Sequence, residues 1–109
     1  MTTIDTTNAH ATLINVFTVE PDKVRALADL LDTVTEETMR HVPGFISANI
    51  HVSTDGTRVV NYAQWASAET YEQMLRDRSA REHMAKAAGL ASGFDPHLYT
   101  VESVHTAPK

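Results

Sequence analysis

Residues 45–71 read FISANIHVSTDGTRVVNYAQWASAETY. Two extended segments, 45–53 and 58–65, flank an Asp-Gly turn, which predicts a β-hairpin because this dipeptide tolerates the positive φ of tight turns. Side chains alternate along a strand, so Asn61 and Trp65 lie on one face of the second segment among apolar neighbours. An amide on an apolar face costs free energy unless it has a hydrogen-bond partner. That partner is either a neighbouring side chain or a bound molecule, and the spacing alone leaves both open.

The segments around this hairpin alternate between strand and helix patterns. Pro21 begins a helix that ends at residues 41–44, and Ser67 caps a helix after the hairpin. A further helical piece follows Asp77, with a capping box that begins at Ser79, and ends at Gly89. The first and the last strand are expected at residues 12–19 and 97–106, with a loop at 91–96.

This order, β-α-β-β-α-β, predicts an α+β, ferredoxin-like fold with a four-stranded antiparallel sheet. Its helices cover one face of the sheet, yet the first three strands carry apolar residues on both faces. A second copy is the simplest cover for the other face, so we expect a homodimer that forms a dimeric α+β barrel. We expect one domain over residues 1–109, with flexible tails at 1–10 and 107–109.

Composition excludes several classes of protein. The net charge is −5 and the nine Lys and Arg are scattered, so we expect no nucleic-acid or anionic-membrane partner. The chain has no cysteine, which excludes disulfides and thiolate chemistry. No apolar run approaches the ~18 residues of a membrane span. Residues 1–10 lack the features of a secretory signal, so a cytoplasmic location is expected.

No known catalytic motif occurs, and the six histidines show no metal-ligand spacing, so no metal site is expected. The polar groups near the hairpin instead suit a hydroxylated aromatic ligand. As catalytic candidates we name Asn61, Trp65, Tyr71 and His51. As substrate-binding candidates we name Asn15, Phe17, Met74, His83 and Met84. Each of these side chains also has a purely structural interpretation as strand or helix packing. The arginines of the later helices, Arg76, Arg78 and Arg81, are expected in solvent, with the alternative that one of them reaches an acidic or phenolate ligand.

The patterns VPGF (42–45), STDGTRVVNYAQW (53–65) and SAETY (67–71) resemble the antibiotic biosynthesis monooxygenase (ABM) family. The likeness runs from about Thr12 to His105 and is greatest to the ActVA-type cofactor-independent, quinone-forming monooxygenases. It implies a dimeric enzyme that oxidises a phenolic polyketide to a quinone with O₂, without metal, flavin or haem. It matches site residues of that subgroup to Asn61, Trp65 and Tyr71, and the histidine before the hairpin to His51. A pocket arginine of the subgroup has no clear counterpart; its position falls near His83.

The resemblance implies that the asparagine and tryptophan stabilise the substrate's phenolate, while the tyrosine or His51 returns a proton to a peroxide. A haem-degrading branch of the same superfamily is a second reading, because Asn15 matches its strand asparagine. This chain departs from that branch at two places. His83 is shifted by one position from the histidine that binds the iron, and Met74 stands where the branch has a helical tryptophan. A third reading is a non-catalytic protein that binds a small ligand.

Overall fold

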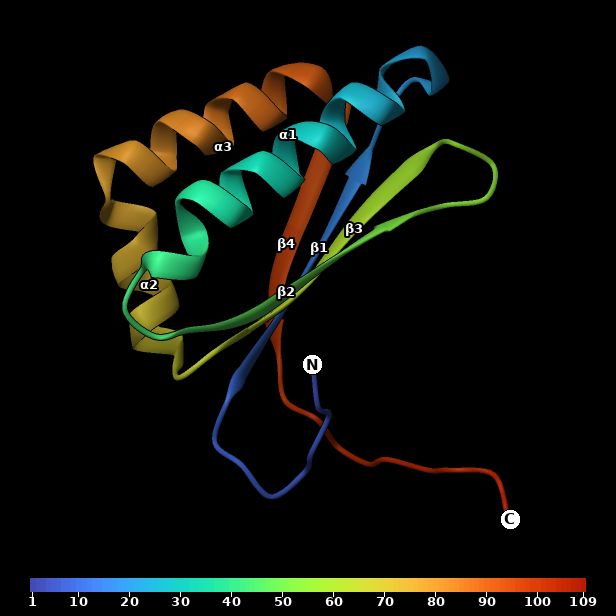
Figure 1. Cartoon of the computed structure of the whole chain (residues 1–109), viewed down its shortest axis with the longest axis vertical. Helices are drawn as coiled ribbons and strands as arrows, with labels where there is room; N and C mark the ends of the chain where they lie inside the picture. The colour runs from blue at the N-terminus through green and yellow to red at the C-terminus, as the bar shows by residue number, and fades with distance from the viewer.

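The computed structural model describes all residues, 1–109, as one sheet covered on one side by helices (Figure 1). The strands are β1 (Ala11–Thr18), β2 (Phe45–Val52), β3 (Arg58–Trp65) and β4 (Gly93–Tyr99). The helices are α1 (Val24–Glu37), α2 (Ala68–Arg76) and α3 (Arg78–Leu90), with short 3₁₀ turns at Pro21–Lys23 and Met39–His41. The predicted order of strands and helices is confirmed.

All neighbouring strands are antiparallel, and their order across the sheet is β2-β3-β1-β4. This is the ferredoxin-like arrangement that the sequence predicts. Figure 1 shows α1 and α3 side by side over one face of the sheet, with α2 at one end of the helical layer. The second copy expected on the other face stays a prediction.

The apolar core between sheet and helices is divided in two. One cluster surrounds Trp65 and contains Leu13, Ala63, Tyr71, Met74 and Ala80; the other surrounds the fully buried Leu27 and Val59 and contains Phe17, Val19 and Ala87. Three successive pairs of β1 and β3 face the helices: Leu13 with Ala63, Asn15 with Asn61, and Phe17 with Val59. The asparagine pair therefore lies between the two apolar clusters.

The strand predicted at residues 97–106 is placed wrongly. β4 spans Gly93–Tyr99 and includes Pro96, which the sequence assigned to a loop, while the chain beyond Tyr99 has no regular structure. β4 is an edge strand that pairs only with β1. A proline is tolerated there because an edge strand does not need every N–H for the ladder.

The start of α3 also differs from the prediction. Its N-cap is Asp77, whose Oδ2 accepts a hydrogen bond from the backbone N–H of Ala80 at 2.9 Å. Ser79 therefore lies inside the first turn, and the predicted capping box is wrong. The helix continues past Gly89 to Leu90. The cap predicted at Ser67 of α2 is confirmed.

A bulge in β2 changes which of its side chains face the helices. Phe45 pairs with Trp65, but Ser47 already pairs with Gln64, the next residue back along β3. Simple alternation would put Phe45 and Ser47 on the same face of the sheet. Because of the extra residue, Phe45 instead lies on the face that carries Trp65, and Ser47 lies on the opposite face. The N-terminal segment lies against the other face, where Gln64 Nε2 donates to the Thr3 carbonyl oxygen at 2.7 Å.

Candidate active site

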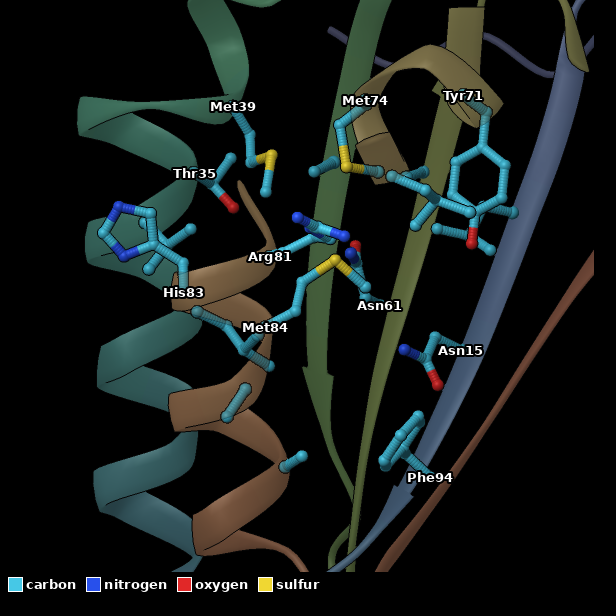
Figure 2. Close-up of a pocket in the computed structure, with 18 of the residues that line it drawn as sticks. Asn15, Thr35, Met39, Asn61, Tyr71, Met74, Arg81, His83, Met84 and Phe94 are labelled. Carbon is cyan, nitrogen blue, oxygen red and sulfur yellow. The ribbon is translucent and has the colours of Figure 1, made fainter. Parts of the chain in front are cut away.

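A cavity of about 420 Å³ opens between the sheet and the helices (Figure 2). β1 and β3 form its floor, and α1, α2 and α3 supply its walls. Of the 22 residues that line it, 17 are hydrophobic. This size and this lining are typical of sites that bind a small, largely apolar molecule.

The floor of the cavity carries the asparagine pair. Asn15 and Asn61 are register partners on β1 and β3, and Figure 2 shows both amides at the cavity. Neither side-chain oxygen has a hydrogen-bond partner although both are buried, and neither amide nitrogen bonds to a protein group. Leaving buried polar atoms unpaired costs about 1–3 kcal/mol each. Two adjacent groups in this state indicate that a bound molecule supplies their partners.

Trp65 is a third unpaired polar group at this cavity. Its side chain is 2% exposed, and its indole Nε1 is buried without an acceptor. The ring packs edge-on between Phe45 and Tyr71, with centroid distances of 5.7 and 6.0 Å. These aromatic contacts fix the orientation of the indole. The indole N–H therefore has no partner within the protein, and the residue that carries it lines the cavity.

Tyr71 lies beside Trp65 at the start of α2, and its hydroxyl makes no hydrogen bond within the protein. Burial raises the pKa of its phenol above the ordinary value of 10. The hydroxyl therefore stays protonated at neutral pH and can donate a hydrogen bond or a proton to a ligand.

The start of α2, which carries Tyr71, is fixed by local geometry. Ser67 Oγ accepts from the Thr70 N–H at 3.1 Å, and Thr70 Oγ1 accepts from the Ser67 N–H at 3.2 Å. Gly44, with φ of +90°, packs directly against Thr70, and a Cβ at Gly44 would overlap with that side chain. Glycine at this position thus lets the turn before β2 contact the first turn of α2.

Three of the chain's four methionines line the cavity: Met39, Met74 and Met84. Figure 2 shows their sulfur atoms near the open space opposite the asparagines. Thioethers are flexible and polarizable, and they contact aromatic rings favourably. This wall therefore suits planar aromatic ligands. The structure places the predicted binding residues Phe17, Met74 and Met84 in the lining.

Arg81 is exposed, as the sequence predicts, and it also lines the cavity. It is the only Asp, Glu, Lys or Arg side chain in the lining, and it takes part in no ion pair. Figure 2 shows its guanidinium at the cavity, near Met84. The available signal was spacing, since residues 81, 84, 85 and 88 share one helical face.

The two candidate histidines have different outcomes. His83 is part of the lining, and its Nε2 lies 3.5 Å from Thr38 Oγ1 at the end of α1. His51, a predicted catalytic candidate, does not line the cavity. His51 pairs with Val60, whose side chain points to the other face of the sheet, and it is exposed. Its Nδ1 lies 3.1 Å from the Asn49 carbonyl oxygen, outside the cavity.

The structure contains no group of three or more His, Asp or Glu side chains arranged to hold a metal ion. None of its helices combines the length and the apolar composition that crossing a bilayer requires. The polar groups of the lining are two amides, an indole, a phenol, an imidazole, one guanidinium and the hydroxyl of Thr35.

Comparison with known proteins connects this site to a family. The model of the antibiotic biosynthesis monooxygenase family matches residues 11–87. This chain belongs to that family. It is 48% identical over 83 residues to tetracenomycin-F1 monooxygenase of Streptomyces glaucescens, covering 76% of this chain and 74% of that protein.

Two solved structures of Streptomyces oxygenases share the fold. The monooxygenase from ActVA-Orf6 of Streptomyces coelicolor, solved with nanaomycin D, is 31% identical, with a TM-score of 0.82 over 92% of this chain and 94% of that one. SnoaB of Streptomyces nogalater, a cofactor-independent oxygenase, is 22% identical, with a TM-score of 0.69 over 93% and 99% of the two chains. The latter likeness concerns the fold alone.

The predictions of an ABM-family domain and of a monooxygenase are therefore confirmed. Within this ABM monooxygenase, the structure brings Asn15, Asn61, Trp65 and Tyr71 together at one cavity. What each of them does there stays a proposal.

Proposed function

We propose that this ABM monooxygenase oxidises a phenolic, polyketide-like aromatic to a quinone with O₂, without metal, flavin or haem. One observation carries the proposal. The apolar core is interrupted at the level of Asn15 and Asn61, whose amides have no partner in the protein, and the unpaired indole N–H of Trp65 lies nearby. The amide N–H₂ groups and the indole N–H can donate to an oxygen that becomes negatively charged during the reaction, while the unpaired amide oxygens can accept the O–H of the neutral phenol.

The substrate lies in the cavity with its ring plane against the methionine wall formed by Met39, Met74 and Met84. Its reacting phenol oxygen points to the floor, where Asn61 and Trp65 donate hydrogen bonds to the phenolate. Asn15 supplies a second amide beside Asn61. His83 is the only histidine of the lining and is our candidate base.

The electron-rich phenolate ring passes one electron to O₂, and the two radicals combine into a peroxide at the activated ring carbon. Tyr71 returns a proton, the O–O bond breaks, and loss of water leaves a carbonyl group. For an anthrone, the ring CH₂ plus O₂ gives the quinone C=O plus H₂O, so atoms and electrons balance. The substrate is the reductant, and the protein contributes orientation and a dry, preorganised environment.

Purified protein treated with a chelator, free of flavin and haem, is to be mixed with an anthrone-type tricyclic phenol under air. The proposal predicts oxygen uptake well above the uncatalysed rate, with one quinone formed per O₂ consumed. Uptake at the uncatalysed rate contradicts it. Ligand affinity without turnover identifies a binding protein, and a Soret shift on haem titration that His83→Ala removes identifies the haem branch.

We also propose that two copies assemble through the face of the sheet that no helix covers. Ile14, Val16 and Val60 lie on that face and remain partly exposed in the single chain. Burying such a face requires roughly 800 Å² per partner for a stable interface. Light scattering coupled to size exclusion is expected to give twice the 12.0 kDa chain mass, and a monomer at micromolar concentration contradicts this assembly.

A further inference from the structure

One charged group at the cavity has no role in the reaction just described. Arg81 lies in the first turn of α3 and lines the cavity without an acidic partner. Its neighbour in the same helix, Arg78, does have one, since its Nε lies 3.5 Å from Glu82 Oε1. The guanidinium of Arg81 is therefore free to bind an anionic group of a ligand.

Arg81 comes from α3, not from the strands that form the floor, and it differs from the floor groups in its exposure to solvent. Asn15 and Trp65 are 8% and 2% exposed, whereas Arg81 is an exposed residue at the edge of the cavity. A permanently charged group is costly to bury but not to hold at a solvent-accessible mouth. A phenol can enter the buried floor neutral, while a carboxylate, ionised at neutral pH, belongs at the mouth.

We infer that the substrate carries a carboxylate on its ring system and that Arg81 binds this carboxylate at the cavity mouth. The inference rests on the proposed function and names the substrate class within it. The planar guanidinium matches a carboxylate through two parallel hydrogen bonds. Because the chain has a net charge of −5, an anionic substrate also needs a local cation at the entrance.

Binding of a non-reactive pair of ligands tests the inference. Anthraquinone-2-carboxylate and anthraquinone-2-carboxamide share one ring system and differ in charge, and neither reacts with O₂. We expect the protein to bind the carboxylate roughly five- to tenfold more tightly, as suits a partly exposed ion pair. The preference is expected to weaken as salt concentration rises.

Arg81→Gln is expected to remove the preference, and Arg81→Lys to keep part of it. Arg76→Gln is the matched control, because it makes the same charge change on α2 outside the cavity lining, and it is expected to keep the full preference. Equal affinity of the original protein for both ligands overturns the inference. A preference that survives in Arg81→Gln, or that Arg76→Gln removes equally, also overturns it.

Failure of the inference and failure of the proposed function are distinguishable. Turnover of a neutral anthrone without any carboxylate preference in binding leaves the proposed function standing and overturns the inference. A carboxylate preference that depends on Arg81, found without turnover of any anthrone, supports the anion site and counts against the oxygenase reaction.

Discussion

Asn15 of β1 and Asn61 of β3 are register partners at the floor of the cavity, and neither amide has a hydrogen-bond partner in the protein. The pairs on either side of them, Leu13 with Ala63 and Phe17 with Val59, are buried in apolar clusters. Two polar groups thus occupy positions where apolar side chains would pack the core better. We propose that a bound ligand supplies the hydrogen-bond partners that these two amides lack within the protein.

Trp65→Phe removes the indole N–H but keeps an aromatic ring between Phe45 and Tyr71. If the N–H stabilises the phenolate, the rate of oxygen uptake at saturating anthrone falls roughly 10- to 100-fold. The smaller ring lowers the free energy of unfolding by about 1–2 kcal/mol, a packing effect without a lost hydrogen bond. Initial rates and urea unfolding measure the two effects, and a rate within threefold of the original contradicts the role of the indole.

Tyr71→Phe tests the buried phenol by its pH dependence. Burial raises the pKa of Tyr71 in the folded chain, so the folded state holds this proton more tightly than the unfolded state. The resulting stability is fully present below the unfolded pKa near 10 and is lost as pH rises through the folded pKa. Between pH 9 and 11 the original protein should lose more stability than Tyr71→Phe in urea unfolding. Parallel curves contradict the raised pKa.

The same Tyr71→Phe variant tests the proton donor. We expect oxygen uptake to fall roughly 10- to 100-fold because general acid catalysis is lost. Affinity for anthraquinone should change less than threefold, since a phenyl ring still fills the position. Weaker binding with an unchanged rate would assign the hydroxyl to ligand binding alone.

Gly44→Ala tests how the start of α2 is held. The substitution places a side chain at φ of +90° and against Thr70, so the free energy of unfolding should fall by about 3 kcal/mol or more. Gly56→Ala is the matched control, because Gly56 also has positive φ (+73°) but has no atom near a Cβ. It should cost only about 1–2 kcal/mol. Equal losses in the two variants would show that the contact with Thr70 contributes nothing.

Ala88→Leu tests the cavity itself. Ala88 lines the cavity from α3, and a leucine there would fill part of the 420 Å³ space. Affinity for a tricyclic quinone is expected to fall about tenfold or more, with stability unchanged or raised by about 1 kcal/mol. Ala26→Leu, at an exposed position of α1, is the control and should leave binding unchanged. Unaltered binding in Ala88→Leu places the ligand elsewhere.

Much of this fold follows from local pattern. The Asp-Gly turn, the alternation along β1 and β3 and the Ser67 cap are each decided by residues close in sequence, and the structure has all three. The prediction for the last strand began too late in the sequence because Pro96 was taken to end regular structure. A proline is compatible with a strand at the edge of a sheet, and β4 is such a strand. Edge position depends on the whole sheet and is not visible in a short segment.

Site residues could be predicted where their direction follows from alternation along a single strand. They could not be predicted where the direction depends on how several strands or helices pack together. Asn61 and Trp65 share a face by alternation, and the register brings Asn15 beside Asn61. His51 was misplaced because its pairing with Val60 puts it on the opposite face. For Arg81 the sequence left two interpretations, because spacing puts residues 81, 84, 85 and 88 on one helical face but does not show that this face meets the cavity.

The central claim is that Asn61 serves a ligand and not the fold. It is tested most directly by the rate of oxygen uptake of metal-free Asn61→Ala with an anthrone, beside Tyr62→Phe. Tyr62 is the next residue, and its hydroxyl is buried without a partner on the other face of the sheet.

We predict that Asn61→Ala lowers the rate roughly 100-fold or more, as loss of an oxyanion donor does. Its free energy of unfolding should change by less than about 1 kcal/mol, because no hydrogen bond within the protein is lost. Tyr62→Phe should keep the original rate. An Asn61→Ala protein that consumes oxygen at the original rate contradicts the account.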